Sequence, residues 1–211
     1  MDIHKIRTDY KRDELKDDGL EQDPIILFRH WFETAVNSNI PEVNAMTLAT
    51  ATTEGLPSAR TVLLKGFDEK GFVFYTNYQG RKATEMGNNP NVALLFFWKE
   101  LERQVRIEGI VEKVTPAESD EYFHSRPLES RLSAIVSKQS MPVESRQHIE
   151  KLWVDFLKES NNKPINRPEY WGGYRVSPIK IEFWQGRPNR LHDRILYSLE
   201  KDTWKIERLQ P

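Results

Sequence analysis

Five strand-like segments joined by short turns constrain the fold more strongly than any other feature of the sequence. They cover residues 45–53, 58–65, 71–77, 91–98 and 101–114. The last segment alternates apolar and polar side chains, with Val105 and Ile107 on one side, which is typical of a strand with one buried face. Residues 91–98 are almost continuously apolar and predict a strand buried on both faces. Five such strands in succession predict a barrel or a curled antiparallel sheet.

Helices are predicted on both sides of this β region. Asp23 and Pro24 supply an N-cap and a first helical position, and an apolar stripe with helical spacing follows them. Residues 115–118 have the pattern of a capping box and begin a helical stretch that Pro127 interrupts. A further apolar stripe predicts a helix over about 144–159 with one buried face.

The C-terminal part of the chain returns to strand patterns. Strands are predicted at 179–185, 194–200 and 203–209. Residues 160–173 are rich in Pro, Asn and Gly and are predicted to form a loop. No repeat or linker divides residues 23–211, which we expect to form a single domain, whereas residues 1–22 are polar and are expected to be a flexible segment. The predicted fold class is mainly β with flanking helices (α+β).

Composition excludes several functional classes. The chain has 211 residues and a formal net charge of −1, so no global basic field indicates a nucleic-acid partner. It has no cysteine, which excludes disulfides and thiolate metal sites, and its five histidines lack metal-ligand spacing, so we expect no metal. The N-terminus lacks the apolar core of a signal peptide, and no apolar run approaches the ~20 residues that span a bilayer. We therefore expect a cytoplasmic protein without a membrane partner.

One candidate site follows the turn at residues 186–189. Arg190, His192 and Arg194 are spaced by two, and in an extended chain this spacing places three side chains on one face. Two guanidinium groups and an imidazole suit a planar anionic ligand, because guanidinium binds phosphate with two donors and stacks on rings. The alternative is an exposed, charged edge strand.

Other basic residues lie at strand ends and helix starts. Arg81 and Lys82 follow Gly80 at a predicted helix start, where the helix dipole favours a phosphate; the alternative is an ordinary exposed helix start. Arg60 and Lys65 differ by an odd number, so in an unbroken strand they face opposite sides. Both could contact one ligand only if a bulge intervenes or a second subunit supplies one of them.

Three residues spaced by four suggest a second anion site. On one helix Tyr122, Arg126 and Ser130 would form a stripe of ring, cation and hydroxyl that can bind a phosphorylated aromatic compound. The alternative is a helix surface broken by Pro127. Further polar or aromatic candidates, whose alternative is ordinary core, turn or loop polarity, are Tyr75, Thr76, Gln104, Gln139 and Ser140.

Several motifs together resemble the pyridoxine/pyridoxamine 5′-phosphate oxidase family over most of the chain. The motifs that carry the resemblance are RTVLLK (60–65), FYTN (74–77), GRKA (80–83), LERQVRIEG (101–109), YFHSRP (122–127), SKQS (137–140), WGGYRV (171–176) and FWQGRPNRLHDR (183–194). The resemblance implies an FMN-binding split β-barrel that works as a homodimer, with FMN in clefts between the subunits. It also implies oxidation of pyridoxine 5′-phosphate and pyridoxamine 5′-phosphate to pyridoxal 5′-phosphate, with hydride transfer to FMN and O2 as the acceptor, giving hydrogen peroxide.

The resemblance also assigns roles to residues. Those expected to bind FMN are Arg60, Thr61, Val62, Leu63, Leu64, Lys65, Tyr75, Thr76, Arg81, Lys82, Gln104, Gln139, Ser140, Trp184 and Arg194. Those expected to bind substrate are Arg7, Tyr10, Lys65, Tyr122, Arg126, Ser130, Arg190 and His192. Arg190 and His192 are the expected catalytic pair beside the pyridine ring, and Arg7 and Tyr10 would belong to a mobile cover.

Three rival interpretations remain at this point. One is another flavin enzyme of the same barrel class with a different substrate. The second is a protein without catalysis that stores FMN or carries pyridoxal phosphate. The third is a nucleic-acid module that uses basic and aromatic residues, which the near-zero net charge disfavours.

Overall fold

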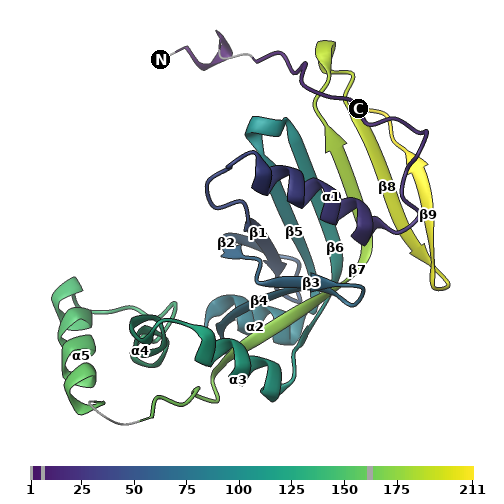
Figure 1. Ribbon diagram of the computed structural model, residues 1–211. Helices are drawn as coiled ribbons and strands as arrows, with labels where there is room; N and C mark the ends of the chain where they lie inside the picture. Colours follow the sequence, from purple (N-terminus) through teal and green to yellow (C-terminus); the bar gives the residue numbers. More distant parts are fainter. Residues whose placement is uncertain (1, 6–7, 161–163) are drawn as a thin grey trace.

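The computed structural model describes residues 2–5, 8–160 and 164–211, which form a strongly curled β-sheet with helices around it (Figure 1). The helices are α1 (Pro24–Asn37), α2 (Arg81–Asn88), α3 (Pro116–Ser125), α4 (Leu128–Val136) and α5 (Arg146–Glu159), with 3-10 turns η1 (Ile3–Lys5), η2 (Lys99–Leu101) and η3 (Pro188–Arg190). The strands are β1 (Ala45–Ala51), β2 (Pro57–Leu63), β3 (Gly66–Asp68), β4 (Gly71–Asn77), β5 (Asn91–Trp98), β6 (Arg103–Lys113), β7 (Trp171–Gln185), β8 (Asp193–Glu200) and β9 (Thr203–Arg208).

The strands join in the order β2-β1-β5-β6-β7-β4-β3, and all these pairings are antiparallel. The long strand β7 pairs with β4 through its first half and with β8 through its second half, while β9 continues from β8. The backbone N–H of Lys65, just after β2, donates to the carbonyl of Val73 on β4 at 2.8 Å. This bond brings the two ends of the strand order together, so the sheet curls toward a barrel.

Helix α1 anchors the core. It begins where predicted, because the Asp23 carboxylate accepts the N–H of Ile25 at 2.8 Å and Pro24 occupies the first turn. The ring of Phe28 is fully buried and meets the rings of Phe72 and Phe96 at centroid distances of 4.9 and 5.2 Å. The inner face of the sheet therefore packs against α1 through aromatic side chains.

Two strand predictions need correction. β5 is buried on one face only: Phe96 is buried, whereas Phe97 is 51% exposed. The outer face stays exposed because no described element of the chain covers it. β7 begins at Trp171, inside the segment predicted as a loop. Its two glycines hide the strand pattern, but they are needed for packing, because a Cβ at Gly172 would lie 2.2 Å from the Tyr78 hydroxyl.

The helical predictions have a mixed outcome. The capping box at Thr115 and Glu118 is confirmed, with α3 starting behind it. The apolar stripe of α5 does not pack into a core as expected: α5 has no buried residue, and Ile149 and Leu152 are exposed. The reason is that α5 projects beyond the sheet and lies beside α4 (Figure 1). Within the described residues, no helix has both the length and the apolar character required to cross a bilayer.

Residues 11–22 of the N-terminal segment are held against the domain. The carboxylate of Glu102 accepts the backbone N–H groups of Lys11 and Arg12 at 2.8 and 2.9 Å. Leu15 is buried, and its N–H donates to Asp193 at 3.0 Å. The residues after Tyr10 therefore have fixed partners, and the role of this segment as a cover stays a prediction.

Candidate functional site

A cavity of about 520 Å³ lies between β2, β4, α2 and the α3–α4 joint, and we call it the cationic cavity. Its wall is formed by Arg60, Thr61, Val62, Leu63, Lys65, Tyr75, Thr76, Lys82, Tyr122, Arg126, Pro127, Ser130, Gln139 and Trp171. Four of these side chains are cationic and none is a carboxylate. The wall thus gathers most of the predicted site and presents a positive field to an anion.

Arg60 and Lys65 line the same cavity although their spacing predicted opposite faces. The expectation assumed an unbroken strand, but β2 ends at Leu63. Leu64 then turns inward and is buried, and Lys65 belongs to the connection that leads to β3. The alternation of side chains stops where the strand stops, so one subunit places both cations in one wall.

The start of α2 forms the most polar part of the wall. Lys82 Nζ donates to Gln139 Oε1 at 2.7 Å and to Thr76 Oγ1 at 3.2 Å. Burial, and then the charge of Arg60, lowers the pKa of Lys82. A Cβ at Gly80 would lie 2.9 Å from Gln139 Oε1, so a larger residue there would displace the Gln139 amide from its contacts. In the part of the chain that the structure describes, no side chain caps the first N–H groups of α2, which leaves donors for an anion.

A buried carboxylate, Glu85, braces the arginines beside this wall. Only 6% of Glu85 is exposed. Its carboxylate accepts hydrogen bonds from Ser58 Oγ at 2.6 Å, Arg81 Nε at 2.8 Å and Thr50 Oγ1. Arg60 NH2 lies 3.4 Å from Glu85 Oε2. Burial alone would raise the pKa of Glu85, but the hydrogen bonds from Ser58, Thr50 and Arg81 outweigh it and lower the pKa to about 2.

This low pKa predicts an acid dependence of stability. Between pH ~4.5 and ~2 the unfolded chain binds a proton at Glu85 that the folded chain does not, so acidification favours unfolding. We expect the free energy of unfolding to fall more steeply from about pH 5 to about pH 3 in the wild type than in Glu85→Gln. Denaturant titrations at each pH measure this. Glu33→Gln, which removes an exposed carboxylate from α1, should keep the wild-type slope. Equal slopes for wild type and Glu85→Gln would contradict the assignment.

Tyr122, Arg126 and Ser130 meet in the cavity, but not on one helix as expected. Helix α3 ends at Ser125, and Arg126 has an extended backbone before Pro127. The three side chains converge because the break redirects the chain. The guanidinium carbon of Arg126 lies 4.6 Å from the centroid of the Trp171 ring, and its buried NH1 has no hydrogen-bond partner among the described residues.

A second group of predicted residues surrounds the turn between β7 and β8, and we call it the polar turn. It contains Tyr10, Arg190 and His192, which line a separate cavity. The rings of Tyr10 and His192 lie 5.6 and 4.6 Å from the Trp184 ring. Arg190 ends the 3-10 turn η3 with a φ of 63°, and β8 begins only at Asp193. The predicted single extended face of Arg190, His192 and Arg194 is therefore wrong, because the chain turns between them.

His192 is held in one orientation. The backbone N–H of Arg187 donates to His192 Nδ1 at 3.1 Å, so the neutral ring carries its proton on Nε2. Burial, and then the charge of Arg190, lowers the pKa of His192, with a smaller opposing effect from Asp193. The neutral imidazole is therefore favoured near pH 7 and presents an N–H donor.

Cross-strand register brings Gln104, Trp184 and Arg194 into one row over β6, β7 and β8. The Arg194 guanidinium donates to both carboxylate oxygens of buried Glu182, at 2.8 and 3.2 Å, and to the carbonyl of Gln210 at 2.7 Å. The hydrogen bond that Arg194 donates to the Glu182 carboxylate raises the pKa of Arg194. These contacts fix Arg194 beside Trp184, on the polar turn rather than in the cationic cavity.

Strand β7 runs from the region of α3 and α4 to the turn before β8 (Figure 1). The residues that line the cationic cavity and the polar turn therefore lie at its two ends. Trp171 starts the strand in the cavity wall, and Gln185 ends it beside the polar turn. At roughly 3.3 Å per residue, these ends are on the order of 40 Å apart along the strand. The cavity as one chain forms it therefore lacks Arg190, His192 and Arg194.

The remaining predicted residues lie near the cavity or beyond the described chain. Leu64 is buried behind the wall, Arg81 turns to Glu85, and Ser140 lies in the adjoining loop near Gly80. Arg7 lies outside the described residues. Their predicted ligand contacts stay predictions.

Two residues of the site, Trp171 and Glu85, were not among the predicted site residues. Trp171 opens a recognised motif, but the neighbouring glycines and the predicted loop concealed its place in the wall. Glu85 lies four residues after Arg81 on α2, and this spacing is the one local signal for its ion pair. Its contacts with Thr50 and Ser58 come from distant strands and have no local signal.

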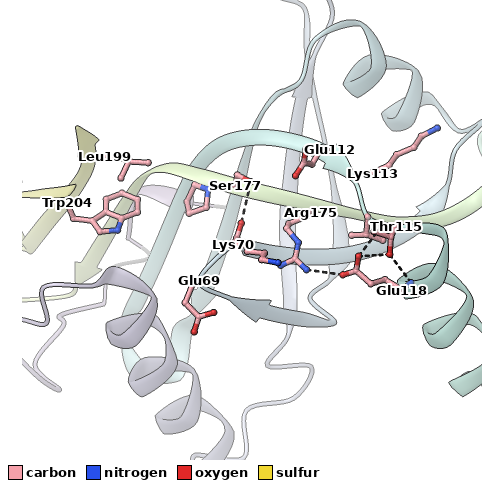
Figure 2. A pocket seen from close by; sticks show the side chains of 12 residues that line it. Glu69, Lys70, Glu112, Lys113, Thr115, Glu118, Arg175, Ser177, Leu199 and Trp204 are labelled. Atoms are coloured by element: carbon pink, nitrogen blue, oxygen red, sulfur yellow. Dashed lines mark hydrogen bonds and ion pairs between the residues drawn. The ribbon is translucent and has the colours of Figure 1, made fainter. Parts of the chain in front are cut away.

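A further cavity, of about 560 Å³, lies between the β3–β4 turn, the end of β6 and the β8–β9 hairpin (Figure 2). Three carboxylates and three cations share its wall, and Arg175 within it is already paired with Asp68 and with Glu118 at 3.1 Å. Its charges balance one another. The cationic cavity, whose wall has no carboxylate, is therefore the better anion site.

Comparison with known proteins agrees with this geometry. A family model described as pyridoxamine 5′-phosphate oxidase matches residues 32–154, and one described as the pyridoxine 5′-phosphate oxidase C-terminal dimerisation region matches residues 171–211. The pyridoxine/pyridoxamine 5′-phosphate oxidase of Rubrobacter xylanophilus is 55% identical over 210 residues, covering 100% of this chain and 97% of that protein. The enzyme of the same name from Nostoc punctiforme is 55% identical over 210 residues, covering 99% and 98%.

Solved structures confirm the fold class. PhzG from Burkholderia lata 383, solved in complex with tetrahydrophenazine-1-carboxylic acid, superposes with a TM-score of 0.89 at 29% identity and covers 94% of this chain and 98% of its own. A pyridoxamine 5′-phosphate oxidase-related, FMN-binding protein from Nostoc punctiforme gives a TM-score of 0.72 at 18% identity, covering 91% and 100%. The predicted split β-barrel with flanking helices is thus confirmed.

Proposed function

The chain belongs to the pyridoxamine 5′-phosphate oxidase family, and we propose that it oxidises pyridoxine 5′-phosphate and pyridoxamine 5′-phosphate to pyridoxal 5′-phosphate with FMN as its cofactor. O2 accepts the electrons and leaves as hydrogen peroxide, and the amine substrate additionally consumes water and releases ammonia. The observation that carries the proposal is the cationic cavity. Its wall has four cations and no carboxylate, and it also contains the rings of Tyr75, Tyr122 and Trp171. This combination suits phosphorylated ring compounds.

The donors in the cavity fit the phosphate of FMN. Lys82, Thr76 and Gln139 meet within hydrogen-bond distance at the start of α2, and Arg60 lines the same wall. Positive charge combined with free helix N–H groups is a suitable environment for a phosphate monoester. FMN, when bound, supplies a two-electron acceptor for the substrate's hydride. The substrate phosphate is then bound by Lys65, Tyr122, Arg126 and Ser130.

A homodimer supplies the residues that the cavity lacks. The matched dimerisation region, 171–211, contains Arg190 and His192 of the polar turn, while Tyr10 comes from the N-terminal segment. Phe97, exposed on the outer face of β5, gives an apolar surface suited to an interface. In the dimer the polar turn of one subunit completes the cationic cavity of the other, with Trp184 and Arg194 toward FMN. Arg190 and His192 then lie beside the substrate's pyridine ring.

The side chains of this site bind and orient the substrate rather than react with it. Arg190 keeps its positive charge, and His192 offers its Nε2 proton as a hydrogen-bond donor because Nδ1 is occupied by the N–H of Arg187. Alignment of the substrate with the acceptor and fixed positive charge lower the barrier without an obligatory acid or base.

An anaerobic titration tests the proposal. The purified protein should be yellow, pyridoxine 5′-phosphate should bleach the flavin colour without oxygen, and air should restore it with hydrogen peroxide as a product. Pyridoxine without its phosphate, at the same concentration, should leave the colour unchanged. A yellow protein that neither phosphorylated substrate bleaches would favour an FMN-storing protein or a different substrate. A protein that takes up no FMN would contradict the cofactor.

A further inference from the structure

We propose that Trp171 is a positioning residue that holds Arg126 for the anionic group of the substrate, using its ring face where proteins commonly use a carboxylate. This inference rests on the proposed function, because it assigns a part to a residue of the same cavity. Its subject is how the positive charge of Arg126 stays available to the anionic group of the substrate.

Arg126 differs from the other arginine that stacks on a tryptophan. Arg103 lies 4.5 Å from the Trp31 centroid, but it also pairs with Asp13 at 2.6 Å and donates to Gln185 at 2.8 Å. Arg126 lies 4.6 Å from the Trp171 centroid. Within residues 2–5, 8–160 and 164–211, its buried NH1 has no hydrogen-bond partner and no carboxylate forms an ion pair with it. The NH1 donors, which no described residue uses, are therefore available for a ligand.

Trp171 is itself held firmly enough to act as a platform. It is 6% exposed, its ring lies 5.3 Å from Phe123, and it runs parallel to Tyr122 with an interplanar angle of 7°. Arg167 fixes its backbone by donating to the Trp171 carbonyl at 2.8 Å. The indole face therefore has one orientation beneath the guanidinium.

The choice of a ring over a carboxylate has a chemical consequence. A carboxylate beside Arg126 would neutralise it and compete with a phosphate for its N–H groups. A ring attracts the cation through its quadrupole and leaves both the charge and the in-plane donors free. The arrangement therefore orients Arg126 while the cavity keeps its positive field.

Steady-state kinetics of the FMN-loaded enzyme with pyridoxine 5′-phosphate test this inference. Trp171→Leu should raise KM about 2- to 30-fold, the range expected for losing one cation–π contact, and leave kcat within about twofold. Trp171→Phe, which keeps a ring, should have a smaller effect. FMN affinity should not change. A fall in kcat and FMN affinity together with the KM effect would show a merely structural role and overturn the inference.

A double-mutant cycle gives the sharper result. If Trp171 acts through Arg126, Trp171→Leu should add less than about twofold to the KM of Arg126→Ala. Effects that multiply in full would overturn the inference. If Trp171→Leu does not fold, the same cycle is run with Trp171→Phe.

Binding measurements separate this inference from the proposed function. Calorimetric titration with pyridoxal 5′-phosphate reports the Trp171–Arg126 coupling even if the protein proves inactive in the bleaching experiment. Coupled losses of affinity would support the role of Trp171 whatever the reaction is. If the two substitutions lower the affinity for pyridoxal 5′-phosphate independently in an enzyme that is active, only the role of Trp171 is overturned.

Discussion

Replacing Arg190 by alanine should lower kcat/KM for pyridoxine 5′-phosphate by about 10- to 1000-fold, on the order expected for losing a charged contact of ~1.5–4 kcal/mol. Arg190 is exposed on the polar turn, where it lines a cavity with Tyr10 and His192. A guanidinium placed there can bind the substrate ring only if a second subunit brings the cationic cavity to it. The measurement is steady-state kinetics at constant FMN loading.

Two controls accompany this variant. Arg190→Lys keeps the charge but loses the planar donor pair, so it should recover only part of the activity. Arg146→Ala removes an exposed arginine of α5 that pairs with Glu150 and should leave kcat/KM unchanged. Wild-type kinetics in Arg190→Ala would remove this residue from the site.

Mixing two impaired variants tests whether Arg190 acts across the dimer. In a heterodimer of Arg190→Ala and Arg126→Ala chains, one site combines an intact Arg126 with an intact Arg190, and the other site lacks both. Equal random mixing makes about half of the dimers mixed, so about a quarter of wild-type activity should return. No recovery after verified subunit exchange would place both residues in a site formed by one chain.

Replacing Phe28 by alanine should lower the free energy of unfolding by about 3–5 kcal/mol, the usual cost of deleting a fully buried aromatic ring. The ring is the centre of a cluster that includes Phe67, Phe72 and Phe96, and it attaches α1 to the sheet. Denaturant unfolding of FMN-free protein measures the change without ligand stabilisation. Ile26→Ala, an exposed change on the same helix, should cost far less. Similar losses for both variants would contradict the assigned core.

Local patterns explain why much of the architecture could be predicted. The N-cap of Asp23, the capping box at Thr115 and the alternation of Val105 and Ile107 depend on neighbours a few residues away. Hydrogen bonds at a helix start and side-chain alternation along a strand are set by backbone geometry, so the sequence reports them directly. The errors occurred where packing outweighs pattern, as at the glycines that open β7 and on the uncovered face of β5.

The family and the residue types of the cationic cavity follow from the sequence alone, through motifs distributed along the chain. How these residues meet depends on the tertiary structure. Arg60 and Lys65 share a wall because β2 ends between them, and Arg126 faces Trp171 because a helix break turns the chain. Arg190 and His192 lie at the far end of β7 from that wall. Distances between segments remote in sequence depend on where strands end and how layers pack, and no local periodicity encodes them.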